Sequence, residues 1–197
     1  ILASGGELSF HATVNARSAA AARGELARLR RAALGAVGRW RYAEGEETLE
    51  AAAGAALKAR KLTVATAESC TGGLIGARLT NVPGSSAYFK GGLIAYADEV
   101  KTRRLGVPRS LLRRHGAVSA PCAASMARGA RRLLGASIGL AVTGIAGPGG
   151  GTKKKPVGLV YLAAAGPGPN IELRRLYLHG LREAVRASAA PAAIALL

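Results

Sequence analysis

Residues 62–76 read LTVATAESCTGGLIG, and they decide the fold because two periodicities meet within them. The β-formers at 62–66 predict a short buried strand. The residues that follow predict a helix over 71–80, opened by Gly72 and Gly73. A strand that passes directly into a helix is the unit from which layered α/β domains are built, so this stretch predicts the fold class.

The same alternation continues along the rest of the chain. Apolar runs predict strands at 92–97, 138–144, 157–165 and 171–178. Amphipathic segments predict helices over 47–60, 98–105, 108–114 and 119–134, and a last helix that begins near Leu181. The final two strands flank GPGPN and predict a hairpin, so the sheet should be mixed. Together these elements predict a three-layer α/β/α domain with a mixed sheet, over residues 47–197.

Residues 1–46 have a different pattern and predict a small α+β module in front of this domain. We expect a strand within 7–16, a helix over 18–34 that opens at Ser18, and a short strand within 36–46. This βαβ-like unit is small enough to be marginal alone. Because the chain starts at Ile1 without a methionine, we expect it to be a fragment or a processed form.

The charge of the chain points to an anionic partner. It has 28 Lys and Arg against 11 Asp and Glu, a formal net charge of +17. Nucleic acid, an acidic membrane surface and a phosphorylated small molecule are all compatible with this charge. Most basic residues occur as scattered pairs, typical of solvated helix faces, and only 153–155 form a run of three. Aromatic residues do not interleave with them, which disfavours a stacking surface for single strands.

The cysteines indicate a reducing compartment. The two cysteines, Cys70 and Cys122, lie far apart, and the His residues are scattered, so no metal site and no cofactor is predicted. We expect a cytoplasmic protein without a membrane span, since no apolar run approaches about 20 residues.

Polar residues cluster where the predicted strands end, which is where α/β sheets carry their sites. Ser69 and Cys70 follow the first strand, and Lys101 lies one turn into the helix after the second. A lysine beside a serine can activate its hydroxyl as a nucleophile, although most helix lysines are simply exposed. Cys70 is the alternative nucleophile, or else a small buried apolar residue.

The helix start after Ser69 offers backbone N–H groups to an anion. Unpaired donors at Gly72, Gly73 and Leu74 could hold a phosphate or the oxyanion of a tetrahedral intermediate. The alternative is that Ser69 or Thr71 only caps the helix and the glycines only permit a tight turn.

Three other residues are candidates for the same site. Arg182, in a turn that enters a helix, suits bidentate contact with phosphate, and Thr143 could donate to a substrate. Tyr96 ends a strand, where it is either a site residue or a buried ring with a bonded hydroxyl.

Several blocks taken together resemble the family of CinA C-terminal domains, the nicotinamide mononucleotide deamidases also called PncC. They occur in the family's order over 47–197, and residues 1–46 resemble the connecting module of full-length CinA proteins. The matching blocks are TAESCTGG (66–73), PGSSAYFKGGLIAYADEVK (83–101), LGV (105–107), HGAVSAP (115–121), TGIAGP (143–148) and KPVGLVYLA (155–163).

The resemblance implies an amidohydrolase that converts nicotinamide mononucleotide to nicotinate mononucleotide and ammonia in pyridine nucleotide recycling. It assigns Ser69 as the nucleophile, and Tyr96 and Lys101 as residues that assist proton transfer. Substrate binding falls to Thr143 and Arg182 and to the helix start Thr71-Gly72-Gly73. The family's pattern also implies no metal and a homodimer.

The chain departs from the family pattern at three places. Asp98 stands where an asparagine is usual, Leu181 where an acid usually precedes Arg182, and Lys153-Lys154 in a loop that is usually acidic. The competing hypothesis is a non-catalytic module, related to competence or DNA damage, that binds nucleic acid or protein. Nucleic acid is compatible with the enzyme hypothesis but is not required by it.

Overall fold

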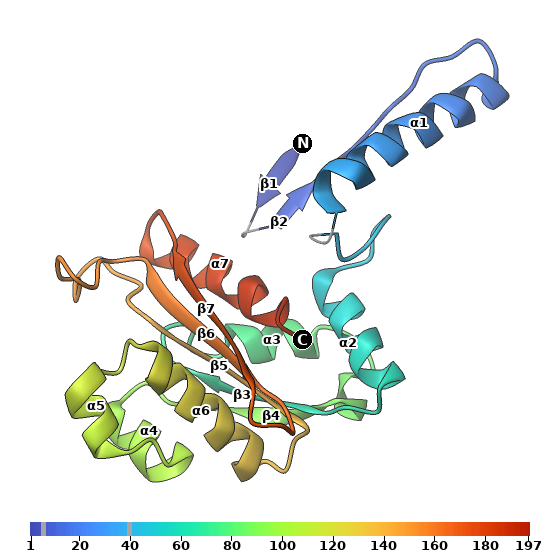
Figure 1. Ribbon diagram of the computed structural model, residues 1–197. Coiled ribbons are helices and arrows are strands. Elements are labelled where there is room, and N and C mark those ends of the chain that lie inside the picture. The colour runs from blue at the N-terminus through green and yellow to red at the C-terminus, as the bar shows by residue number, and fades with distance from the viewer. Residues whose placement is uncertain (5–6, 39–40) are drawn as a thin grey trace.

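The fold was obtained as a computed structural model that describes residues 1–4, 7–38 and 41–197. A five-stranded mixed sheet in the order β4-β3-β5-β6-β7 forms its centre (Figure 1). The first three strands of that order are parallel, and β6 and β7 form an antiparallel hairpin. The strands are β3 (Val64–Glu68), β4 (Phe89–Ile94), β5 (Ile138–Gly144), β6 (Leu159–Ala165) and β7 (Ile171–Tyr177).

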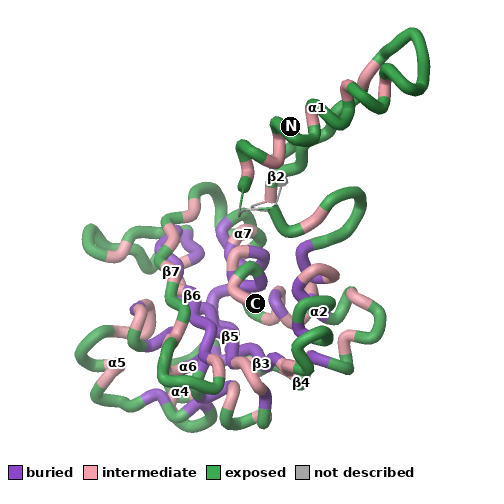
Figure 2. Tube along the Cα trace, turned by 45° about the vertical axis from the view of Figure 1, so that its right-hand side comes forward, coloured by how far each residue is buried: buried purple, intermediate pink, exposed green. Residues whose placement is uncertain are grey.

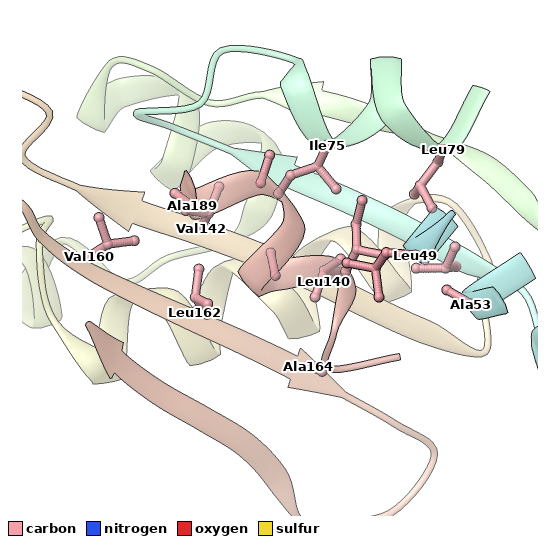
Figure 3. Close-up of a cluster of buried hydrophobic side chains, with 14 of the residues drawn as sticks. Leu49, Ala53, Ile75, Leu79, Leu140, Val142, Val160, Leu162, Ala164 and Ala189 are labelled. Atoms are coloured by element: carbon pink, nitrogen blue, oxygen red, sulfur yellow. The ribbon is translucent and has the colours of Figure 1, made fainter. Parts of the chain in front are cut away.

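Helices cover both faces of this sheet and make three layers. One face carries α2 (Leu49–Ala59), α3 (Leu74–Thr80) and α7 (Arg182–Ile194), whose apolar residues pack on the sheet as in Figure 3. The other face carries α4 (Asp98–Leu105), α5 (Arg109–His115) and α6 (Ala120–Leu133). The predicted α/β/α fold with a mixed sheet is therefore confirmed.

Small residues let α6 approach the sheet closely. A Cβ built on Gly139 of β5 would lie 1.9 Å from the carbonyl oxygen of Ala127 in α6, so the helix backbone rests almost directly on the strand. The helix begins as its sequence predicts, because the Ser119 hydroxyl accepts a hydrogen bond from the Cys122 N–H at 3.3 Å. The strands β3 and β5 are in turn buried along almost their whole length, as expected for strands covered on both sides.

The N-terminal segment consists of a short hairpin and one long helix. Strands β1 (Leu2–Ser4) and β2 (Glu7–Ser9) pair antiparallel, and α1 (Ala19–Val37) starts at the predicted cap Ser18. The helix has no buried residue, and Figure 2 shows it away from the buried core. No helix in the described ranges is both long and apolar enough to cross a membrane.

Contacts of Glu7 link the hairpin to the main domain. Its carboxylate accepts hydrogen bonds from the Tyr42 hydroxyl at 2.8 Å and from Arg78 of α3 at 2.7 Å. Arg78 also pairs with Glu50 of α2. One guanidinium thus joins three segments that are distant in the sequence.

Several expected boundaries were wrong. The strand expected within 7–16 stops at Ser9, and β4 begins at Phe89 and ends at Ile94, three residues earlier at each end than the strand expected at 92–97. The strand expected within 36–46 overlaps the end of α1, and residues 39–40 lie outside the described residues. Residues 41–46 are described and form no strand, and Glu44 within them bonds to Arg30 and Arg41.

Candidate functional site

The candidate residues lie at the carboxyl edge of the parallel strands. Ser69 continues the ladder beyond β3, since its N–H donates to the Val142 carbonyl of β5 at 3.1 Å. On the other side of β3, Ala95 follows the end of β4, and its N–H donates to the Glu68 carbonyl at 2.7 Å. Ser69 therefore stands in one row with Ala95 and with Thr143, at the point where three strands end.

Alternation along β3 decides which face each side chain occupies. Ala65 and Ala67 belong to the core under α4 and α6, whereas Val64 and Cys70 belong to the core under α7. Side chains alternate along a strand, so Ser69 faces the α4 and α6 side.

Lys101 of α4 lies on the same side as Ser69 and is buried. It is 1% exposed, and its ammonium donates to the Tyr96 carbonyl at 2.8 Å and to Asp98 Oδ1 at 3.4 Å. Asp98 is itself largely exposed, so the ion pair is only half desolvated. A shielded ammonium of this kind is unusual for a helix lysine and marks a functional candidate.

Cys70 lacks the properties of a nucleophile. Burial raises the pKa of its thiol to about 11, and the neighbouring Glu68 carboxylate acts in the same direction. At neutral pH Cys70 is therefore a thiol and not a thiolate. Because its side chain packs under α7, it also faces away from Lys101. The geometry favours Ser69 among the two nucleophiles that the sequence left open.

Glu68 occupies the helix start that we expected to bind an anion. Its carboxylate accepts hydrogen bonds from the Gly73 N–H at 2.9 Å, the Ile75 N–H at 3.1 Å and the Gly76 N–H at 2.8 Å. The Thr71 hydroxyl donates to it at 2.7 Å. The expectation of an unpaired donor was therefore wrong for Gly73, because the chain supplies its own carboxylate at the positive end of α3. For the Leu74 N–H it stays a prediction.

Gly72 and Gly73 serve the turn that makes this arrangement fit. The Gly72 N–H donates to the Ser69 carbonyl at 3.2 Å, so it too is engaged. Gly73 is the N-cap of α3 with φ 101°, a left-handed conformation that other residues rarely adopt. The N–H groups of Gly72 and Gly73 both bond within the protein, and both glycines have a positive φ. The structure therefore supports the alternative interpretation, in which these glycines permit a tight turn.

Tyr96 and Lys101 are joined through a carbonyl and not through the tyrosine hydroxyl. The Tyr96 ring is 58% exposed, and its hydroxyl accepts a hydrogen bond from Arg182 at 2.8 Å. Arg182 also donates to the Gly147 carbonyl at 2.8 Å. Tyr96, Arg182 and the loop after β5 thus form one connected rim.

Thr143 is buried, and its hydroxyl donates to the Ala117 carbonyl at 2.9 Å. Its donor is therefore used within the protein, and only its oxygen lone pairs remain for a ligand. The predicted roles of Thr143 and Arg182 in binding substrate remain predictions.

Two residues that sequence reasoning did not select also shape this edge. Arg186, one turn after Arg182, donates to the Thr71 carbonyl at 3.0 Å and so adds a second cation near the start of α3. Lys155 donates to the His115 and Val118 carbonyls at 2.6 Å and 2.7 Å, fixing the loop after β5 to the segment before α6. In the sequence Lys155 appears as part of a solvated lysine run, and only the wider block KPVGLVYLA sets it apart.

Comparisons with known proteins agree on one family. Residues 46–197 match the family described as CinA C-terminal domain. A competence-damage inducible protein of Moorella thermoacetica is 46% identical over 196 residues, which is all of this chain and 47% of that protein. A CinA-like protein of Gemmatimonas aurantiaca is 51% identical over 158 residues, covering 80% of this chain and 37% of that protein. This chain thus spans about half the length, or less, of these relatives.

The fold has counterparts among solved structures. The crystal structure of the competence/damage inducible protein CihA from Agrobacterium tumefaciens superimposes with a TM-score of 0.73 at 40% identity, covering 75% of this chain and 90% of that one. A competence damage-inducible protein A from Klebsiella pneumoniae gives a TM-score of 0.72 at 38% identity, with 75% and 91% of the two chains covered. On sequence and on fold alike, this chain belongs to the CinA C-terminal domain family.

Proposed function

We propose that the chain is an amidohydrolase that converts nicotinamide mononucleotide to nicotinate mononucleotide and ammonia. The observation that carries this proposal is the buried Lys101, placed on the same face of the sheet as Ser69. Ser-Lys pairs activate a hydroxyl without a histidine, and a base of this kind works from a water-shielded position.

The reaction takes place in two halves. Lys101 Nζ accepts the proton of the Ser69 hydroxyl while Ser69 Oγ attacks the carboxamide carbon. The tetrahedral intermediate then breaks its C–N bond, and the lysine returns the proton so that ammonia leaves. Lys101 then takes a proton from a water molecule, whose oxygen attacks the acyl ester; the bond to Ser69 Oγ breaks, the lysine returns the proton to Ser69, and nicotinate mononucleotide is released.

The phosphate of this substrate requires cations, and two arginines of α7 are available near the site. Arg182 donates to Gly147 and Tyr96 at the rim, and Arg186 donates to Thr71 just before α3, so each uses only some of its N–H groups on the protein. Guanidinium groups with remaining donors suit a phosphate. Because Glu68 fills the helix N-terminus, we assign phosphate binding to these arginines.

An ammonia-release assay with nicotinamide mononucleotide tests the proposal, with glutamine and nicotinamide as control substrates. Ser69→Ala should abolish release while circular dichroism shows the fold intact, and Cys70→Ala should keep most of the activity. Full activity in Ser69→Ala would exclude the serine mechanism. Absence of activity in the unaltered chain would favour the non-catalytic alternative, in which the +17 charge serves a macromolecular partner.

We also infer a homodimer with this edge at or near its interface. Ile94, Tyr96 and Leu181 are 55%, 58% and 84% exposed. Ile94 lies beside Gly73 at the start of α3, and Tyr96 bonds to Arg182, the neighbour of Leu181 in the sequence. Large apolar side chains gathered at one place are typical of an interface. Light scattering measures the molar mass of the unaltered chain, expected to be a dimer, and of Leu181→Glu, in which the dimer should be weakened. A monomeric unaltered chain would contradict the inferred homodimer.

A further inference from the structure

A basic hollow lies at the opposite end of the sheet from Ser69. It has a volume of about 450 Å³ and is lined by Arg128, Arg131 and Arg132 of α6 and by the glycines Gly135, Gly166 and Gly168. We propose that this hollow binds a soluble, multiply phosphorylated anion. The proposal is independent of the amidohydrolase reaction.

The three arginines are positioned by the backbone and retain donors. Arg128 donates to the Pro169 carbonyl at 3.2 Å, Arg131 to the Ser137 carbonyl at 3.1 Å and Arg132 to the Leu105 carbonyl at 3.3 Å. A guanidinium has five N–H donors, so each of these contacts leaves several for a ligand. Within the described ranges, no carboxylate lies within 4.0 Å of these three groups, whereas seven other Lys and Arg residues do have such a partner.

A structural role at the helix end accounts for part of this cluster only. Arg131 and Arg132 lie in the last turn of α6, where cations stabilise the helix dipole. Arg128 lies a turn earlier and reaches the β6–β7 turn instead. Three cations that line one hollow without an acid within 4.0 Å, in the part of the chain that the structure describes, repel one another, and a bound anion would relieve this repulsion.

The opposite wall is open to a ligand that approaches closely. Nothing lies within 4 Å of an ideal Cβ at Gly135, Gly166 or Gly168, so these positions leave space and expose the backbone. Figure 1 shows the β6–β7 turn at the end of the sheet away from the loop that follows β5. Since a seven-residue strand such as β5 spans roughly 20 Å, the hollow is separate from the site at Ser69.

The charge of the hollow selects the chemistry of the ligand. Three guanidinium groups match an anion with several negative charges, and their planar donor pairs match phosphate oxygens better than a single carboxylate. Inorganic triphosphate is the simplest probe with these properties.

Titration calorimetry of the full chain with triphosphate tests the proposal, with citrate as an anion of similar charge but different geometry. We expect saturable one-to-one binding of triphosphate, with citrate about tenfold weaker or more. Arg128→Gln with Arg131→Gln should weaken triphosphate about tenfold or more, while Arg113→Gln with Arg114→Gln, a matched pair on exposed α5, should change it by less than about twofold.

A second variant guards against a folding defect in the arginine variants. Gly166→Asp places a negative charge in the wall of the hollow, and Gly24→Asp places the same charge on exposed α1; neither built Cβ meets a neighbour within 4 Å. Only Gly166→Asp should weaken triphosphate, and Ser69→Ala should leave it unchanged. Equal weakening in the control variants, or citrate that binds as tightly as triphosphate, would show a non-specific charge effect and overturn the proposal. The proposal would also be overturned if the variants in the hollow, Arg128→Gln with Arg131→Gln and Gly166→Asp, lost affinity for duplex DNA but kept it for triphosphate.

Discussion

Arg182 donates a hydrogen bond to the Tyr96 hydroxyl at 2.8 Å and thereby joins the start of α7 to the segment that follows β4. The same guanidinium holds the Gly147 carbonyl, so it connects three segments that surround the candidate site. Under the proposed function, this arginine both orders the rim and meets the substrate phosphate.

Replacing Arg182 should therefore affect binding more than chemistry. Arg182→Lys keeps the charge but loses the forked donors, and we expect KM for nicotinamide mononucleotide to rise about tenfold with a smaller fall in kcat. Tyr96→Phe removes only the accepting hydroxyl and should cost less than Arg182→Lys. Steady-state kinetics of both variants measure the two effects; a fall in kcat alone for Arg182→Lys would contradict a binding role.

Glu68 should be a major determinant of stability. It is 2% exposed and accepts hydrogen bonds from three backbone N–H groups and the Thr71 hydroxyl. Glu68→Gln keeps the shape but loses the charge and turns an acceptor into a donor, which should lower the free energy of unfolding by roughly 3 kcal/mol. Urea denaturation measures the loss, and Glu183→Gln, on an exposed side chain in the first turn of α7, is the control.

Asp98 should restrain the lysine opposite the proposed nucleophile. Its carboxylate lies 3.4 Å from the Lys101 ammonium and attracts it. If Lys101 must give up its proton to act as a base, Asp98→Asn should increase kcat/KM. The expected gain is only about two- to fivefold, because Asp98 is mostly exposed. Glu99→Gln, on the same turn, serves as the matched control, and a decrease in Asp98→Asn would oppose the base role of Lys101.

The two cysteines should make the fold sensitive to alkali. Burial raises the pKa of both Cys70 and Cys122 to about 11, from a usual value of 9.0. Above pH 9 the unfolded chain loses thiol protons that the folded chain retains, so the free energy of unfolding should fall as the pH rises from about 9 to 11. The variant Cys70→Ala with Cys122→Ala should show a flatter pH dependence in urea denaturation. If the free energy of unfolding of this variant fell with pH as steeply as that of the unaltered chain, groups other than the two cysteines would cause the pH dependence.

Thr66 offers a stabilising substitution. Its hydroxyl is buried in β3 and has no hydrogen-bond partner among the described residues, which is costly. Thr66→Val keeps the shape and should raise the free energy of unfolding by about 1 kcal/mol in urea denaturation. Gly92→Ala should instead destabilise the fold. The added Cβ would lie 2.2 Å from the Thr66 hydroxyl oxygen, which is too close for two atoms that are not bonded.

Periodic segments could be predicted well from the sequence. The strand at 138–144 and the helix at 98–105 were predicted to the residue. The strand has a continuous apolar run, and the helix starts with two acidic residues and stops before Gly106. The β4 strand was predicted to start too late, since Gly91 and Gly92 resemble a loop in the sequence. Gly92 is required in the strand by its neighbour Thr66, and such a cross-strand contact leaves no local signal.

The helix α3 begins at Leu74, three residues later than expected, and the reason lies in the site. Residues 69–72 turn so that Glu68 reaches the N–H groups of the helix. A carboxylate just before a helix hinted at this cap, but which donors it would take depends on the turn. The contact between Arg186 and Thr71 spans 115 positions, and no spacing in the sequence foretells it.

The carboxylate of Glu68 has a consequence for how this family could acquire new substrates. Many α/β enzymes seat a phosphate on the first turn of a helix, and here that seat is permanently taken by a group covalently part of the chain. Under the proposed function, recognition of the substrate's anionic end therefore depends on individual side chains of α7 and not on a backbone cradle. Selectivity for the charged end of a substrate should then vary with single substitutions along α7, while the turn after β3 stays fixed.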